Sequence, residues 1–140
     1  MSDFDIAIIG AGIAGASLAA EISADKKVLL LESEALPGYH STGRSAAFWD
    51  ESYGGPAVQP LTTASGPFLA HPPIDFHEGP LMHQRGALHL GTDAHNELAD
   101  SLLSDFAESG VRFDRLNRTG IEVHVPGLLP SWTSGLWEPD

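Results

Sequence analysis

Residues 5–15 read DIAIIGAGIAG, a short apolar run that leads directly into three glycines spaced as Gly-x-Gly-x-x-Gly. Such a run is typical of a buried parallel strand. The Ala-rich segment 13–24 predicts a helix, and the apolar residues 27–31 predict a second buried strand. Strand, glycine turn, helix and strand make one βαβ unit, whose crossover we expect to be right-handed.

The three glycines and the acid that follows the second strand suit a dinucleotide. Gly10 permits the tight turn off the strand, Gly12 lets the backbone approach a pyrophosphate, and Gly15 lets the helix pack closely on the sheet. The helix amino terminus adds N–H donors and the positive end of its dipole. Glu32 stands 22 residues after Gly10, where a carboxylate binds a ribose diol and repels a 2′-phosphate. The motif alone does not separate NAD from FAD.

Residues 37–47 read PGYHSTGRSAA. This run resembles the second flavin loop of the D-amino acid oxidase-like family of FAD-dependent oxidoreductases, which includes glycine oxidase, sarcosine oxidase and D-amino acid dehydrogenase. The resemblance is specific over residues 3–55 and looser from there to residue 140. It implies that the chain binds FAD non-covalently. The residues implied for FAD are Gly10, Ala11, Gly12, Ile13, Ala14, Gly15, Glu32, Ser33, His40, Thr42, Gly43, Arg44, Ser45 and Ala46.

Two residues of this loop carry further implications of the resemblance. His40 and Arg44 keep a His-x-x-x-Arg spacing found in the sarcosine oxidase branch. Arg44 is therefore a candidate to stabilise reduced flavin or to bind a substrate carboxylate. An equal alternative is that Arg44 binds a phosphate or forms a structural ion pair. No other catalytic residue is assigned. One branch attaches FAD through a histidine at the position of His40, whereas the 2-hydroxyglutarate branch keeps the same residue and binds its flavin non-covalently.

The resemblance implies an α/β fold made of two parts. Residues 1–80 are expected to form the amino-terminal βαβ part of a Rossmann-type FAD-binding domain, and residues 81–140 the beginning of an α+β substrate domain. Family members are longer, and their chain returns to complete the flavin domain. We therefore expect residues 1–140 to be an incomplete fold that is inactive alone, with the missing carboxyl-terminal half as a candidate partner.

The rest of the chain predicts short elements. They are a helix at 44–48, a helix within 56–70 interrupted by Pro60 and Pro67, an extended segment at 81–90, an amphipathic helix at 96–109, and strands at 111–113 and 121–125.

Composition narrows the classes of partner and site. Seven Lys and Arg against nineteen Asp and Glu give a charge of −12, so a basic face for nucleic acid is not expected. There is no cysteine, which excludes disulfides and thiolate sites. No apolar run is long enough to span a membrane, and we expect a cytoplasmic protein. Five histidines recur every six residues from His71 to His95, a spacing that does not gather them on one face, and no metal site is expected.

The implied activity is hydride transfer from a small substrate to FAD. The substrate would be an amine, an amino acid or a 2-hydroxy acid, oxidised at the carbon that bears the amine or hydroxyl group. Two alternatives stay open at this point. One is a fragment of an NAD-dependent dehydrogenase, which the His-Ser-Thr-Gly-Arg-Ser run of residues 40–45 disfavours. The other is a non-catalytic truncated product, or a half-site that needs a partner.

Overall fold

The computed structural model describes residues 3–140, and the chain divides into two compact units, 1–47 and 48–140. Each unit is described here by itself. These compact units differ from the two domains expected for the family fold, residues 1–80 and 81–140, and that domain boundary stays a prediction. Among residues 3–140, no helix combines the length and the apolar character needed to cross a bilayer.

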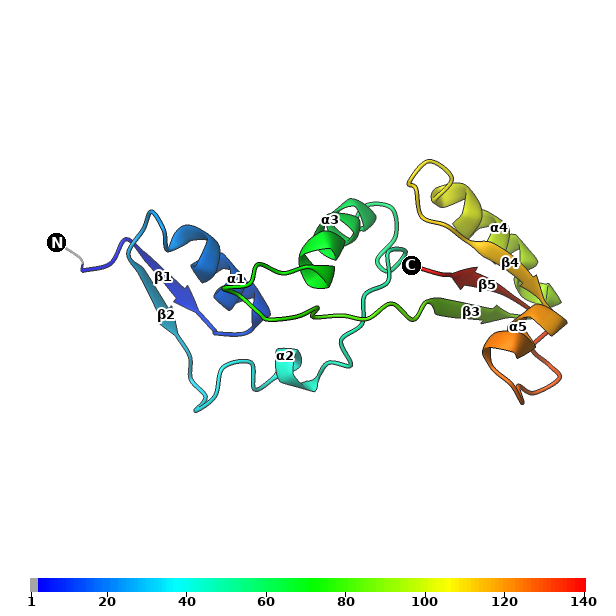
Figure 1. Ribbon diagram of the computed structural model, residues 1–140, viewed down its shortest axis with the longest axis horizontal. Helices are drawn as coiled ribbons and strands as arrows, with labels where there is room; N and C mark the ends of the chain where they lie inside the picture. Colours follow the sequence, from blue (N-terminus) through cyan, green and yellow to red (C-terminus); the bar gives the residue numbers. More distant parts are fainter. Residues whose placement is uncertain (1–2) are drawn as a thin grey trace. The chain divides into compact units, whose positions relative to one another are not determined.

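The first unit is the βαβ unit that the glycine motif predicts, and the prediction is confirmed (Figure 1). Strand β1 (Ile6–Ile9) leads into helix α1 (Ile13–Ile22), which returns the chain to strand β2 (Val28–Leu31). The two strands pair in parallel, with Ile6 opposite Val28 and Ile9 opposite Leu31. A one-turn helix α2 (Ser41–Arg44) follows. The α/β class follows directly from this topology.

The two-stranded sheet leaves much of its apolar surface uncovered among the residues that the structure describes. Ile9 is 88% exposed and Ile13 is 71% exposed, and of the described residues in this unit only Ile8 and Ala11 are apolar and buried. Parallel sheets normally have both faces covered. The uncovered faces agree with the expectation that this segment is one part of a larger flavin domain.

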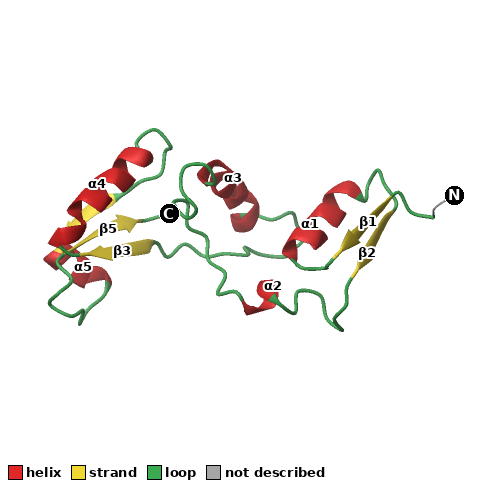
Figure 2. Ribbon diagram, turned by 180° about the vertical axis from the view of Figure 1, so that it is seen from behind, coloured by secondary structure: helices red, strands yellow, loops and turns green. Residues whose placement is uncertain are grey.

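The second unit is a three-stranded antiparallel sheet with helices (Figure 2). Its elements in chain order are α3 (Gln59–Ala70), β3 (Ala87–Gly91), the 3-10 helix η1 (Asp93–His95), α4 (Asn96–Asp105), β4 (Asp114–Asn117), α5 (Arg118–His124) and β5 (Ser134–Glu138). The strand order is β3-β5-β4, so the last strand lies in the middle. His89 of β3 and Arg115 of β4 both lie opposite Leu136 of β5.

A small apolar core holds the second unit together. Phe106, Ile121 and Leu136 are 2%, 0% and 4% exposed. Phe106 packs edge-on against Phe113, with ring centroids 5.9 Å apart. On helix α5, Ile121 lies against Gly135 of the central strand, where a side chain would leave no room.

Helix α5 corrects one sequence prediction. The pattern of residues 121–125 predicts a strand, but Arg118–His124 is helical. Asn117 caps this helix, because its side-chain oxygen accepts a hydrogen bond of 3.0 Å from the Gly120 N–H. The cap and the burial of Ile121 outweigh the strand preference of the local residues.

Other boundaries also differ from the predictions. The helix expected at 96–109 ends at Asp105, and the extended segment expected at 81–90 forms a strand only over Ala87–Gly91. The expected strand at 111–113 starts later, at Asp114, and the expected helix at 44–48 lies earlier, at Ser41–Arg44. Helix α3 runs unbroken from Gln59 to Ala70. Pro60 lies in its first turn, where a missing N–H removes no intrahelical bond. Pro67 lies inside the helix, which ends three residues later.

Replacing Ile121 with alanine is expected to destabilise the second unit by about 2–5 kcal/mol, because it leaves a cavity beneath a fully buried side chain. Urea unfolding of the full chain measures the change. Val123→Ala, two residues along the same helix at a position 76% exposed, is the control and should move the free energy of unfolding by about 0.5 kcal/mol or less. Equal effects of the two variants would contradict the assigned core.

Candidate dinucleotide site

The glycine turn after β1 requires glycine at two positions for different reasons. Gly10 has φ +98°, a left-handed conformation that other residues rarely adopt. Its N–H donates a 2.7 Å hydrogen bond to the Leu31 carbonyl, which closes the turn onto β2. Gly15 packs so closely on the turn that a Cβ atom there would overlap the Gly10 carbonyl oxygen. The turn therefore brings the start of α1 directly against the sheet.

Two backbone N–H groups of this turn are held by side chains from later segments. The Ala11 N–H donates to Glu32 Oε2 at 2.8 Å, and the Ile13 N–H donates to Thr42 Oγ1 at 3.0 Å. A Cβ on Gly12 would stand 3.1 Å from the same Thr42 oxygen. Glu32, which follows β2, and Thr42 of the second loop thus both contact the amino terminus of α1.

Glu32 is held as an ionised carboxylate. The Ala11 N–H, the Glu34 N–H and the Ser33 N–H all donate to it, at 2.8, 3.1 and 2.8 Å. These hydrogen bonds, led by that of Ala11, lower the pKa of Glu32 against an opposing effect of desolvation. A carboxylate only accepts hydrogen bonds, and Oε2 keeps a lone pair beyond the one that Ala11 uses. It is therefore suited to accept from the hydroxyls of a ribose.

The second loop is tightly wound around two glycines. Gly38 has φ +69°, and the Gly43 N–H donates to its carbonyl at 2.6 Å. A Cβ on Gly43 would come within 2.5 Å of that carbonyl oxygen. This turn fixes Thr42 so that its hydroxyl reaches the start of α1 across 29 positions of sequence.

His40 points its ring at an acid of the same unit. Its Nε2 lies 2.8 Å from Glu34 Oε1, and the ring stands edge-on to Tyr39. The pair links the end of β2 to the start of α2. Neither Glu34 nor Tyr39 is among the residues predicted for the site, because no local pattern marks them.

Arg44 lies on an aromatic ring of its own loop. Its guanidinium carbon is 5.2 Å from the centroid of the Tyr39 ring, a cation–π contact. Ala14 lies in the first turn of α1, whereas Ser45 and Ala46 follow α2 as exposed residues without helix or strand structure. The structure thus gathers Gly10–Gly15, Glu32–Glu34 and Tyr39–Arg44 in one unit.

This arrangement meets the requirements of a bound dinucleotide. The glycine turn keeps side chains away from the amino terminus of α1, whose N–H groups and dipole attract phosphate. The ionised Glu32 is hydrogen-bonded to that turn, because it accepts from the Ala11 N–H. A ligand with a diphosphate next to a ribose matches these two features at once.

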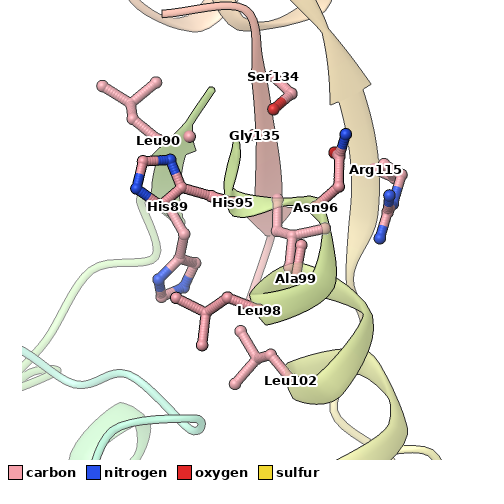
Figure 3. Close-up of a pocket in the computed structure, with 12 residues that line it drawn as sticks. His89, Leu90, His95, Asn96, Leu98, Ala99, Leu102, Arg115, Ser134 and Gly135 are labelled. Carbon is pink, nitrogen blue, oxygen red and sulfur yellow. The ribbon is translucent and has the colours of Figure 1, made fainter. Parts of the chain in front are cut away.

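The second unit holds a polar cluster that the sequence did not predict. Oxygen and nitrogen atoms of Asp50, His89 and Glu138 lie within 4.8 Å of one another. Of the regularly spaced histidines, His89 alone belongs to this cluster, and no sequence signal connects three residues so far apart. His89 also lines a pocket of about 280 Å³ between helix α4 and the sheet, whose walls are mainly apolar (Figure 3).

Comparison with known proteins agrees with this fold. A model of the FAD dependent oxidoreductase family matches residues 5–140. The crystal structure of glycine oxidase from Geobacillus kaustophilus superposes with a TM-score of 0.78 at 18% identity, over 97% of this chain and 39% of that one. The crystal structure of glycine oxidase from Bacillus cereus superposes with a TM-score of 0.76 at 18% identity. The match covers 99% of this chain and 39% of that one.

The chain therefore spans about two-fifths of the length of the glycine oxidases that it matches. At this level of identity the two structures show the shared fold, and the family match covers nearly the whole sequence. This chain belongs to the FAD dependent oxidoreductase family.

Proposed function

We propose that the first unit binds FAD non-covalently, as part of an oxidoreductase that oxidises a small amine, amino acid or 2-hydroxy acid. The observation that carries the proposal is the convergence of Glu32 and Thr42 on the amino terminus of α1. The family match supports FAD over NAD. An NAD-dependent dehydrogenase is not favoured.

Each group of the site has a role in holding the cofactor. Glu32 accepts hydrogen bonds from the hydroxyls of the adenosine ribose, and the N–H groups at the start of α1 face the diphosphate. Thr42 to Ala46 would hold the diphosphate and the ribityl chain. Bound flavin supplies the hydride acceptor. Arg44 provides the positive charge of the loop, suited to a substrate carboxylate or to the flavin ring.

The surroundings of His40 support non-covalent binding. Its Nε2 is engaged with Glu34 Oε1 at 2.8 Å, so a covalent link through that nitrogen would have to break the pair. His40 is exposed and Glu34 is half-buried, and we assign this pair to joining the loop to the end of β2. The carboxyl-terminal remainder of a family member is the partner that would complete the substrate site.

Cofactor release tests this proposal. Purified chain is mixed with FAD, freed of excess by gel filtration and precipitated with acid. We expect a yellow protein whose flavin stays in the supernatant. A yellow pellet would contradict non-covalent binding. A parallel titration with NAD is expected to show no saturable binding, and a chain that binds NAD but stays colourless with FAD would overturn the proposal.

Replacing Thr42 with valine keeps the size of the side chain but removes the acceptor of the Ile13 N–H. We expect FAD affinity to fall about threefold to tenfold, the worth of one neutral hydrogen bond. Thr42→Ser keeps the hydroxyl, and its FAD affinity should stay close to that of the unmodified chain. Fluorescence quenching of FAD measures both, and equal loss in the two variants would assign the effect to packing instead.

A further inference from the structure

The sheet of the second unit brings Asp50, His89 and Glu138 together. His89 on β3 and Glu138 on β5 are diagonal neighbours across the paired strands, since Ala87 lies opposite Glu138 and Leu136 lies opposite His89. Diagonal neighbours share one face of a sheet, within reach of long side chains. Asp50 joins them from the segment that precedes α3. Oxygen and nitrogen atoms of the three side chains therefore lie within 4.8 Å of one another.

Ser52 orients both carboxylates of this cluster. Its N–H donates to Asp50 Oδ1 at 3.0 Å and to Glu138 Oε1 at 3.2 Å, and its hydroxyl donates to Asp50 Oδ1 at 3.0 Å. Within the part of the chain that the structure describes, no donor bonds to Asp50 Oδ2, and Glu138 Oε2 has only His89 as a hydrogen-bonding neighbour. Each acid thus uses one oxygen for Ser52 and keeps the other for a further ligand.

Negative charge exceeds positive charge in the cluster. Asp50 is 8% exposed and Glu138 is 1% exposed, and buried carboxylates are costly unless positive charge balances them. Among residues 3–140, no lysine or arginine forms an ion pair with either acid, because the paired arginines contact other carboxylates. Even a protonated His89 supplies one positive charge against two negative ones. A divalent cation bound beside a neutral imidazole would balance both carboxylates.

The distance between His89 and Glu138 suits a shared metal ion better than a hydrogen bond. His89 Nε2 lies 3.4 Å from Glu138 Oε2, beyond the roughly 2.7–3.2 Å of an N–H···O hydrogen bond. Zn²⁺ binds imidazole nitrogen and carboxylate oxygen at about 2.0–2.2 Å in a tetrahedral arrangement, which places two ligand atoms about 3.4 Å apart. A tetrahedral ion therefore fits between these two atoms as they stand.

His89 also gives the cluster access to solvent. Its side chain is 36% exposed, in contrast to that of Glu138. It lines the pocket of about 280 Å³ between α4 and the sheet (Figure 3). An ion can therefore enter on the side of His89, and a water molecule there can serve as the fourth ligand.

We propose that Asp50, His89 and Glu138 bind one divalent transition-metal ion, of which Zn²⁺ is the test case. The ligand atoms are Asp50 Oδ2, His89 Nε2 and Glu138 Oε2, and Ser52 holds the two carboxylates in place for the ion. An imidazole in the ligand set favours zinc, iron, nickel or copper over magnesium and calcium. The ion joins residues 50–52 to β3 and β5.

This inference goes beyond the proposed function, because the site lies wholly in the second unit and uses no flavin. The sequence pattern gave no reason to expect a metal, since the regular spacing of five histidines does not gather them. The proposed site uses only His89 of those five. Its other two ligands come from segments that the folded sheet brings to it.

Binding of Zn²⁺ tests the site. The full chain is prepared without a histidine tag, freed of metal with a chelator and titrated in a calorimeter. We expect one ion per chain. His89→Gln removes the nitrogen ligand and should weaken binding about a hundredfold or more, and Asp50→Asn should weaken it likewise.

The matched control is His83→Gln, which removes an exposed histidine six residues before His89. Its affinity for Zn²⁺ should equal that of the unmodified chain. Equal losses in His83→Gln and His89→Gln would assign the binding to surface histidines and overturn the site. Absence of saturable binding by the unmodified chain would also overturn it.

Nuclear magnetic resonance locates the ion without any variant. The ¹⁵N-labelled chain is titrated with Zn²⁺ in the absence of FAD, and we expect the largest changes in chemical shift at His89 Nε2 and at the Ser52 amide. Changes confined to other histidines, or an equal response to Mg²⁺, would overturn the inference. A chain that binds Zn²⁺ at His89 but does not bind FAD would overturn only the proposed function.

Discussion

Replacing Gly15 with alanine is expected to lower FAD affinity by about tenfold to a hundredfold. A Cβ atom there would overlap the Gly10 carbonyl oxygen, which belongs to backbone and cannot rotate away as a side chain would. Helix α1 must then move off the turn, and its N–H groups leave the position proposed for binding the diphosphate. Overpacking of this kind costs about 1–3 kcal/mol or more. Titration of FAD against the two chains measures the loss.

The matched control is Gly79→Ala. No atom lies within 4 Å of the place that a Cβ on Gly79 would take, and the φ of this residue is not left-handed, so alanine fits there without strain. Its FAD affinity should equal that of the unmodified chain. Undiminished binding by Gly15→Ala, with a circular dichroism spectrum like that of the control, would contradict the close packing of helix on turn.

The second large effect is expected at Glu32. Glu32→Ala removes the acceptor proposed for the ribose hydroxyls and leaves the Ala11 N–H without its partner. Hydrogen bonds to charged groups contribute about 1.5–3 kcal/mol, which predicts roughly a tenfold to hundredfold loss of FAD affinity. Glu32→Gln keeps an acceptor but loses the charge. Its FAD affinity should lie between those of the unmodified chain and Glu32→Ala. Isothermal titration calorimetry separates the three chains.

The control for charge is Glu21→Ala, which removes an exposed carboxylate from α1 of the same unit. Its affinity for FAD should change little, so a similar loss in both variants would assign the effect to net charge. A pH series adds a second check. Because the pKa of Glu32 is lowered below 4.5, its contribution persists above that pH and is lost only as pH falls through the lowered value.

The fold of the first unit was predictable because its signals are local. The strand, the glycine turn and the helix lie within one stretch of sequence, and each glycine has a steric reason that the structure shows at Gly10 and Gly15. Glu32 follows at the distance that the crossover dictates. Thr42 was expected to contact the cofactor, but its hydrogen bond to the Ile13 N–H spans two loops and has no sequence signature.

The second unit was harder to predict because its structure depends on long-range contacts. Helix α5 carries a strand-like sequence, and its burial against Gly135 decides the outcome. Strand β5 pairs with β3, a segment far from it in the sequence. The cluster of Asp50, His89 and Glu138 exists only once this sheet has formed. No periodicity connects these three residues, and the regular spacing of the histidines has no structural meaning of its own.

Backbone amide chemical shifts test the proposed FAD site most directly, residue by residue. The full chain of 14.8 kDa is labelled with ¹⁵N and titrated with FAD. We predict the largest changes in chemical shift at Ala11 to Ala14, at Ser33 and Glu34, and at Thr42 to Ala46. The amide shifts of α5 and β4 should stay unchanged. Saturable shifts confined to other residues, or no shifts at all with the chain folded, would contradict the assignment of the FAD site.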